Sequence, residues 1–166
     1  LHDILVDFGG EDLVGTGRGI DGCGIPVYGM SLGALARAAQ RMAAPVGVSE
    51  ERGHAIQRIL AAGMAHPYMV AGRARFDTDT MNALKGVVAT KAGAEGVHVA
   101  IVPSKGLGIV LKVEDGAKRA ADVAMGWLLD RYGFLDDAAR HKIAAHLAPK
   151  IPNAAGDEAG MIRIAG

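Results

Sequence analysis

The sequence has little cysteine, few aromatic residues and no net charge. Its single cysteine, Cys23, cannot form an internal disulfide, which is typical of a reducing compartment, so we expect the cytoplasm. A formal net charge of zero argues against a nucleic-acid surface or a polybasic membrane anchor. No apolar run approaches the roughly 20 residues that span a bilayer, and no cationic start precedes an apolar segment as in a secretory signal. We therefore expect neither nucleic acid nor membrane among its partners.

Apolar aliphatic residues and glycine dominate the composition of the chain. The 166 residues suffice for one domain with a sizeable core, and half of them are hydrophobic. With only 4% aromatic residues and 24 glycines, the core must be built from Val, Ile, Leu, Met and Ala in closely packed elements. The chain opens on Leu1 without a methionine, so we expect either a processed start or one part of a longer chain.

Hydrophobic spacing predicts helices before and after a central antiparallel meander. Ser31 caps a helix over 30–43, and Ser49 caps the next, whose apolar stripe (Ala55, Ile56, Ile59, Leu60 and Met64) is expected in the core until His66 and Pro67 end it. Residues 1–20 show no helical periodicity. The remaining predictions are helices over 79–84, 117–131 (buried face including Val123, Trp127 and Leu128) and 136–147, strands within 87–102 and over 107–113, and a 150–166 tail with an edge strand at 160–164.

This order predicts an α+β fold, in which helices pack on an antiparallel β-sheet within a single domain, 1–166. Gly15 to Gly19 superficially resembles a dinucleotide fingerprint, but no βαβ unit surrounds it. A nucleotide-binding fold is therefore not expected.

The stretch 87–102 contains the first candidate site. A β-branched run ends at Lys91, then Gly93 and Gly96 flank a tight corner before the next strand. A cation at a strand end, beside glycines that free backbone N–H groups, can hold an anion or an oxyanion. The alternative is a solvated hairpin lysine with glycines that only make the turn.

Asp21, Gly22 and Cys23 form the second candidate site. Glycines on both sides of Cys23 predict a bend that leaves the thiol uncovered, as a nucleophile or a metal ligand. The alternative is that Cys23 is a small buried hydrophobic residue and Asp21 caps a turn.

Other polar residues favour structural roles. Arg37 and Arg41, one helical turn apart, are expected to be solvated. In the loop 72–79, Asp77 or Thr78 could cap the following helix, and the Arg/Asp-rich loop could be catalytic or an ion-pair clasp, of which we favour the clasp. His66 and His98 lack partners at metal-ligand spacing, so no histidine metal site is expected.

A nucleophile other than Cys23 is not recognisable. Ser31, Ser49 and Ser104 all lack a lysine three residues later, and the Gly-x-Ser-x-Gly, His-Glu-x-x-His and Cys-x-x-Cys motifs do not occur. Any other nucleophile must come from elsewhere, or there is none.

Several motifs, in order along nearly the whole chain, resemble the L-asparaginase II family, the Rhizobium-type asparaginases. They are residues 21–26 (DGCGIP), His66-Pro67 with Gly72, 75–78 (RFDT), 91–96 (KAGAEG), 106–112 (GLGIVLK) and 115–116 (DG). That family is similar in fold to the serine β-lactamases, penicillin-binding proteins and serine-dependent glutaminases. The resemblance therefore implies part of a β-lactamase-like fold, in which Lys91-Ala92-Gly93 lines the active site.

The resemblance also implies a longer protein. Family members are about twice this length, and their Ser-x-x-Lys nucleophile motif lies in the N-terminal half, whereas this chain matches the C-terminal half. We therefore expect a fragment or one part of a split protein, which either forms a homo-oligomer or retains a separate N-terminal half. The implied reaction is hydrolysis of L-asparagine to L-aspartate and ammonia through an acyl-enzyme on a serine outside this chain, with no required cofactor.

The implied site has two parts. The catalytic residues would be Lys91, the Ala94 N–H as an oxyanion donor, and Cys23 beside the site. The substrate-binding residues would be Asp21, which would hold the α-ammonium group, together with Gly22, Gly93 and Glu95. Zinc (Zn) at Cys23 would require ligands from the missing half.

One residue departs from the pattern of the β-lactamase-like relatives. Ala92 stands where those relatives carry a hydroxyl residue, so any hydrogen bond from that side chain is lost. Two alternatives to the enzyme follow from the sequence: a truncated, non-catalytic binding or assembly module, and a thiol enzyme that uses Cys23.

Overall fold

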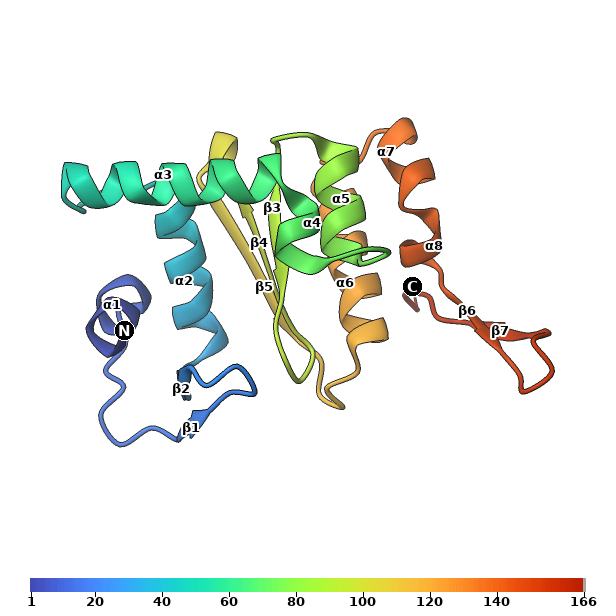
Figure 1. Cartoon of the computed structure of the whole chain (residues 1–166), viewed down its shortest axis with the longest axis horizontal. Helices are drawn as coiled ribbons and strands as arrows, with labels where there is room; N and C mark the ends of the chain where they lie inside the picture. Colours follow the sequence, from blue (N-terminus) through green and yellow to red (C-terminus); the bar gives the residue numbers. More distant parts are fainter. Residues whose placement is uncertain (166) are drawn as a thin grey trace.

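The computed structural model describes residues 1–165, and Figure 1 gives the arrangement of its elements. The helices are α1 (His2–Gly9), α2 (Leu32–Ala43), α3 (Glu50–Ala65), α4 (Pro67–Ala71), α5 (Phe76–Leu84), α6 (Lys118–Arg131), α7 (Asp137–Lys142) and α8 (Ala144–Leu147), with a 3₁₀ turn η1 (Pro103–Lys105). The strands are β1 (Arg18–Ile20), β2 (Pro26–Tyr28), β3 (Ala89–Ala92), β4 (Val97–Val102), β5 (Leu107–Lys112), β6 (Lys150–Pro152) and β7 (Glu158–Met161).

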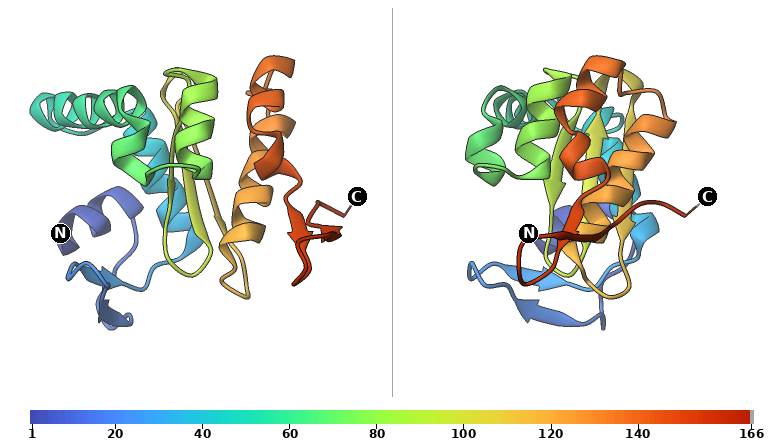
Figure 2. Two further views of the ribbon diagram at one scale, coloured as in Figure 1. Left: turned by 45° about the vertical axis from the view of Figure 1, so that its right-hand side comes forward. Right: turned by 90° about the vertical axis from the view of Figure 1, so that its right-hand side faces the viewer.

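A three-stranded antiparallel sheet, in the order β3-β4-β5, lies between two helical layers (Figures 1 and 2). The pairs β1–β2 and β6–β7 form separate two-stranded ribbons. The predicted α+β class, with helices on an antiparallel sheet, is confirmed. The predicted strand at 160–164 overlaps β7 at residues 160–161 alone, and β7 pairs with β6 instead of extending the main sheet.

Strand alternation divides the core in two, because successive side chains point to opposite faces of a sheet. One face, which includes Ala89, Val99 and Ile101, packs against α1, α2 and α3. The other face, which includes Val88, Ala100 and Val102, packs against α5, α6 and α7. Lys91 shares the first face, since its register partner is Val99.

The absence of a side chain at Gly108 brings α2 close to the sheet. A Cβ atom at this position of β5 would lie 2.5 Å from the Gln40 backbone nitrogen and 2.7 Å from Ala39 Cβ. Only glycine allows this approach. Ser31 caps α2 as predicted, since its side chain accepts a hydrogen bond from the Ala34 N–H, and the helix begins at Leu32 instead of residue 30.

The N-terminal helix α1 corrects two predictions. Residues 1–20 show no helical periodicity, yet residues 2–9 are helical; the segment is too short for a pattern, and α2 stabilises its end. Arg37 and Arg41 are not merely solvated, because they donate hydrogen bonds to the carbonyls of Gly9 and Asp7. Cations at these carbonyls stabilise a helix C-terminus.

The α5 helix corrects the prediction for the loop 72–79. It begins at Phe76, three residues before the predicted start, and neither Asp77 nor Thr78 caps it. The Thr78 hydroxyl instead donates to the Gly72 carbonyl at 2.6 Å, and the Asp77 carboxylate faces the sheet.

Two helical stripes are only partly buried. Ile56 and Leu60 of α3 lie in the core as predicted, whereas Ile59 is 63% exposed. In α6, Val123 is buried but Trp127 is 40% exposed, because Met125 and Leu129 face the sheet instead. The predicted helix over 136–147 is divided at Ile143 into α7 and α8.

Candidate active site

The corner between β3 and β4, residues 91–96, is tightly built. The Gly93 N–H donates a hydrogen bond to the Val97 carbonyl at 2.8 Å, and the Val97 N–H donates one to the Ala94 carbonyl at 3.2 Å. Glu95 and Gly96 have φ angles of 53° and 70°. Two successive positive φ angles define the type I′ geometry that matches the twist of paired strands, which explains the glycine at 96.

The predicted anion-binding groups are accessible at this corner. Lys91 is exposed at the end of β3, and its ammonium group contacts the Ala92 carbonyl. Among the described residues, no acceptor pairs with the N–H of Ala94. The corner therefore presents a cation and a free backbone donor within a few residues, which suits an anion or a developing oxyanion.

The β5–α6 connection supports the corner. The Val113 N–H donates to the Gly96 carbonyl at 3.1 Å, and a Cβ atom at Gly116 would lie 2.9 Å from the Glu95 carboxylate. The two loops thus pack on one another, and a larger residue at Gly116 would displace the Glu95 side chain.

Asp21 and Cys23 occupy the exposed turn of the β1–β2 ribbon. The Asp21 carboxylate accepts the Gly22 N–H at 2.8 Å, and the Gly24 N–H closes the turn on the Asp21 carbonyl. The Cys23 thiol is exposed and lies 3.9 Å from the Asp21 carboxylate. Cys23 is therefore not a buried hydrophobic residue, whereas the reading of Asp21 as a turn cap agrees with these contacts.

The two candidate clusters lie at the same end of the molecule (Figures 1 and 2). Within residues 1–165, no hydrogen bond or ion pair joins the Asp21 turn to the Lys91 corner. This part of the chain also holds no group of three or more His, Cys, Asp or Glu residues that could bind a metal. Cys23 and Asp21 supply two ligands, and a protein zinc site uses three or four, so these residues do not fit zinc by themselves.

Sequence reasoning missed a buried polar cluster behind the corner. Asp77 of α5, His98 of β4 and Asp122 of α6 are 3%, 0% and 9% exposed. His98 Nε2 lies 2.7 Å from the Asp77 carboxylate, which also accepts the Ala92 N–H at 3.0 Å. The strand alternation that buries Ala100 and Val102 was the available signal, because it places His98 on the same face.

Burial and hydrogen bonding oppose each other at Asp77. Desolvation would raise its pKa, but the hydrogen bond and charge of His98, together with the Ala92 N–H, outweigh it and lower the pKa below the ordinary aspartate value. Asp77 is thus held as a carboxylate directly behind the strand that carries Lys91.

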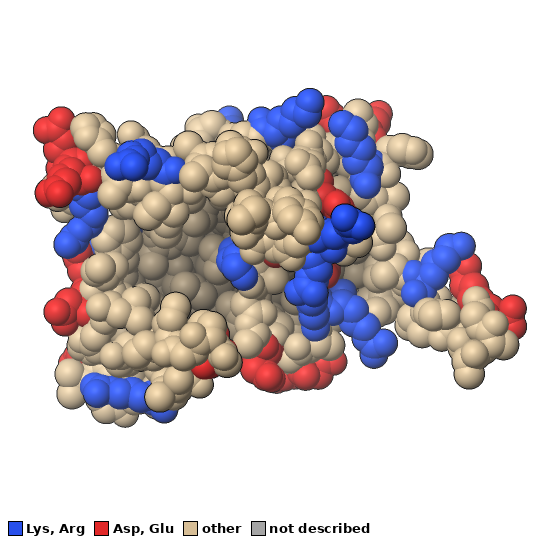
Figure 3. Space-filling view, in the orientation of Figure 1, with Lys and Arg blue, Asp and Glu red and all other residues tan. Residues whose placement is uncertain are grey.

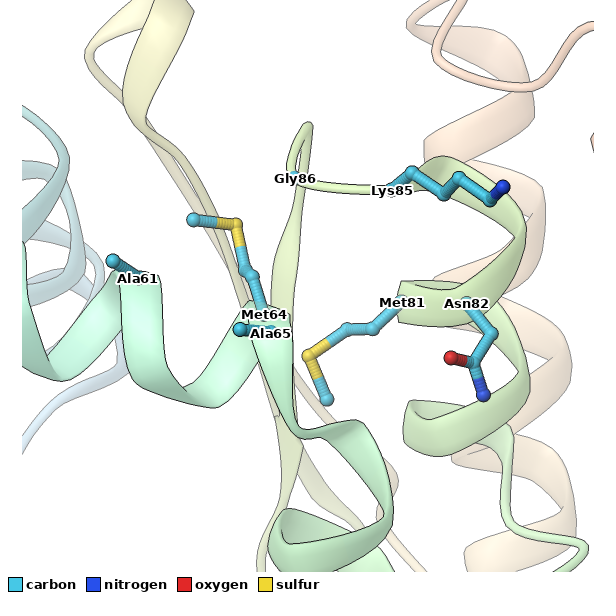
Figure 4. A pocket seen from close by; sticks show the side chains of 7 residues that line it. All are labelled: Ala61, Met64, Ala65, Met81, Asn82, Lys85 and Gly86. Atoms are coloured by element: carbon cyan, nitrogen blue, oxygen red, sulfur yellow. The ribbon is translucent and has the colours of Figure 1, made fainter.

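One groove lies elsewhere, between α3, α5 and the connection that leads to β3 (Figure 4). It measures about 490 Å³ and is lined by Ala61, Met64, Ala65, Met81, Asn82, Lys85 and Gly86. The Lys85 and Asn82 side chains point away from the two methionines, so the groove does not gather polar groups as a substrate site does.

A second hollow is visible in Figure 3 between α3 and the segment of α1, β1 and β2. Its surface on this face carries few charged side chains. Large hydrophobic side chains are exposed in the α1–β1 connection and in the β1–β2 ribbon, including Val14 (73%) and Ile20 (78%).

None of the described helices is long and apolar enough to cross a membrane. A model of one protein family, L-asparaginase II, matches residues 3–164. A search of curated proteins found no match.

Proposed function

The chain belongs to the L-asparaginase II family, and on that premise we propose that it forms one wall of an asparaginase-type amidohydrolase site. The substrate is L-asparagine, whose side-chain amide is hydrolysed to give L-aspartate and ammonia. The observation that carries the proposal is the corner at residues 91–96, which presents an exposed lysine and an unpaired N–H in a chain matched almost end to end by the family.

The proposed reaction has two steps. A serine hydroxyl oxygen bonds to the amide carbonyl carbon, the C–N bond breaks, and the nitrogen leaves as ammonia with the hydroxyl proton. Water then hydrolyses the acyl-enzyme, which releases L-aspartate and regenerates the serine. The serine comes from outside residues 1–166, because Ser31 and Ser49 cap helices and Ser104 lies in η1.

Each predicted residue except Cys23, which lies beside the site, has a role in this scheme. Lys91 neutralises the substrate carboxylate or assists proton transfer, and the Ala94 N–H donates to the oxyanion. Asp21 holds the α-ammonium group, since a carboxylate favours a cation. Gly22, Gly93 and Glu95 border the substrate, and the small glycines leave it room. Exposure of the Asp21 turn and the Lys91 corner at one end of the molecule supports these assignments.

Three further proposals rest on the membership of the chain in the L-asparaginase II family. The sheet and its helices form part of a β-lactamase-like fold, in which Ala92 replaces the hydroxyl residue of the relatives. The protein works in the cytoplasm, in keeping with its single exposed cysteine. The reaction requires no cofactor and no metal-dependent step, and zinc at Cys23 would depend on ligands from outside the chain.

We also propose that a second protein surface covers the hollow of Figure 3, either in a homo-oligomer or from a separate N-terminal half. The exposed hydrophobic side chains of Val14 and Ile20, in the segment from α1 to β2 that borders the hollow, support this, because exposed apolar surface commonly marks interaction sites. Light scattering should show an assembly larger than the monomer. A clean monomer that binds no hydrophobic dye would contradict the proposal.

The second candidate function is a non-catalytic binding or assembly module. Ala92 and the missing Ser-x-x-Lys favour it. The module would bind a small amino acid or a partner chain and release no ammonia in any assembly. The coding sequence upstream of Leu1 would distinguish the enzyme from the module. An in-frame Ser-x-x-Lys there would favour the enzyme, and a stop codon would favour the module.

L-Aspartate binding to the 166-residue chain, followed by NMR, tests the proposed site. We expect shifts at residues 91–96 and around Asp21, and a roughly tenfold weaker Kd in Lys91→Ala, the loss of about one charge-assisted hydrogen bond. Lys105→Ala is the control, because η1 lies at the opposite end of β4. Equal effects of both substitutions would refute the assignment of Lys91.

Ammonia release by the same chain tests the mechanism. We expect negligible hydrolysis of asparagine, because no activated serine is present. Robust release that is insensitive to serine reagents, and is lost on alkylation of Cys23, would replace the serine mechanism with the thiol alternative.

A further inference from the structure

The buried cluster of Asp77, His98 and Asp122 lies behind the corner and has no part in the proposed chemistry. Polar side chains are rarely buried to this degree unless they are paired. Each comes from a different element, so the cluster connects α5, β4 and α6. These features call for a role beyond filling the core.

Asp77 satisfies a backbone donor at the edge of the sheet. The strand β3 is an edge strand, and the Gly93 N–H pairs inward with Val97. Because amides alternate along an antiparallel ladder, the neighbouring Ala92 N–H points outward, away from β4. The Asp77 carboxylate accepts this N–H at 3.0 Å.

His98 fixes the same carboxylate from the other side. A carboxylate only accepts hydrogen bonds, so Nε2 carries the proton at the 2.7 Å contact with Asp77. His98 is the register partner of Ala92, and Asp77 therefore bridges the two strands over this pair.

Packing and one hydrogen bond hold the imidazole ring in place. The Phe76 ring packs edge-on against the His98 ring, with their centroids 5.1 Å apart. The Asp122 Oδ1 atom lies 3.8 Å from His98 Nδ1. Lys118 pairs with Asp122 from one turn away on α6. His98 Nδ1 and the facing Asp122 oxygen make no hydrogen bond to any described residue, so the hydrogen bond at Nε2 and the packing of Phe76 hold the ring.

We propose that Asp77 and His98 are positioning residues of the corner: they anchor β3 at Ala92 and so hold Lys91 and the Ala94 N–H in place for an anionic ligand. They act from the face opposite Lys91 and do not touch the ligand. Its identity as L-aspartate or L-asparagine rests on the proposed function, whereas the anchoring of β3 does not.

Amide hydrogen exchange, measured by NMR on the 166-residue chain, tests the anchoring. In the unmodified protein we expect the Ala92 amide to be protected although it faces the sheet edge. In Asp77→Ala it should exchange about tenfold faster, as expected when one hydrogen bond is lost, and Asp77→Asn should restore part of the protection because an amide oxygen still accepts. An unprotected Ala92 amide in the unmodified protein would overturn the proposal even if the alanine variant did not fold.

Asp79→Ala is the matched control. Asp79 lies on the same helix and also pairs with a histidine, His146, at 2.7 Å, but it makes no hydrogen bond to β3 among the described residues. Exchange at Ala92 should be unchanged in this variant. Equal acceleration in both variants would mean general loosening of α5 and would refute a specific anchor.

Titration with L-aspartate separates this proposal from the proposed function. Asp77→Ala should weaken L-aspartate binding, with a Kd about fivefold higher, because the free energy lost is part of that of one hydrogen bond. Asp77→Asn should recover most of the affinity. If the unmodified chain binds no L-aspartate, the proposed function is refuted, and the exchange data still decide the anchoring. If L-aspartate binds equally well to all variants, the positioning role is refuted.

Discussion

Replacement of Gly108 by alanine should shift α2 away from the sheet. Gly108 lies opposite Ile101 on the face that α2 covers. An added Cβ atom would lie 2.5 Å from the Gln40 nitrogen, 2.7 Å from Ala39 Cβ and 2.8 Å from the Ala39 carbonyl carbon. Two of these are backbone atoms of α2, so no side-chain rotation relieves the overlap and the helix itself must move.

The cost follows from these distances. Carbon atoms pack best at about 3.5–4.0 Å, so α2 must move by roughly 1 Å. Inserting a methyl group into a packed core typically costs about 1–3 kcal/mol. The smaller backbone entropy of alanine in the unfolded chain returns about 0.4–1 kcal/mol. Because two of the overlaps involve backbone atoms, the upper part of that cost range, about 2–3 kcal/mol, applies, and the net loss in the free energy of unfolding is about 1–2.6 kcal/mol.

Urea unfolding followed by circular dichroism measures this loss. With an m value of about 2 kcal/mol/M, the midpoint should fall by about 0.5–1.3 M. Gly160→Ala is the matched control, since Gly160 is also a strand glycine but has open space where its Cβ atom would lie. A Gly108→Ala midpoint within about 0.2 M of the unmodified protein would refute the close packing of α2 on β5.

Two further predictions concern the corner. Gly96→Ala and Gly15→Ala should each lose about 1 kcal/mol, because both glycines have positive φ angles (70° and 80°). Gly96→Ala should lose more, since its Cβ atom would lie 3.1 Å from Val113 whereas Gly15 faces open space; equal urea midpoints would contradict the packing of the two loops. The lowered pKa of Asp77 means that its carboxylate stabilises the folded state fully above the ordinary aspartate value near 4, and that this contribution is lost as pH falls through the lowered pKa. Unfolding free energies measured from pH 7 to pH 3 should therefore fall less steeply in Asp77→Asn, and parallel curves would show that the pairing with His98 does not perturb this carboxylate.

Local signals in the sequence predicted much of the fold. The serine caps of α2 and α3 and the strand and turn of residues 97–112 lie where their chemistry indicates. The turn glycine Gly96 has a positive φ angle, as a hairpin requires. The family was also recognisable from motifs in the sequence and is confirmed.

Helix faces were less predictable than helix positions. Ile59 and Trp127 satisfy the helical period but are 63% and 40% exposed, because the partner layers cover only part of each helix. Amphipathic spacing indicates which side chains share a face. It does not say how wide a strip the neighbouring elements cover.

In the candidate site, too, local sequence determined some features and tertiary structure determined the others. The residue types at Lys91 and Gly96 determined a cation beside a tight corner, because turn geometry depends on a few neighbouring residues. The helix α1, the exposure of Cys23 and the anchor of Asp77 on Ala92 were decided only by tertiary structure. Arg37 reaches Gly9 across 28 residues of sequence, and Asp77 reaches His98 across 21. Such contacts depend on how the layers pack, which local periodicity does not encode.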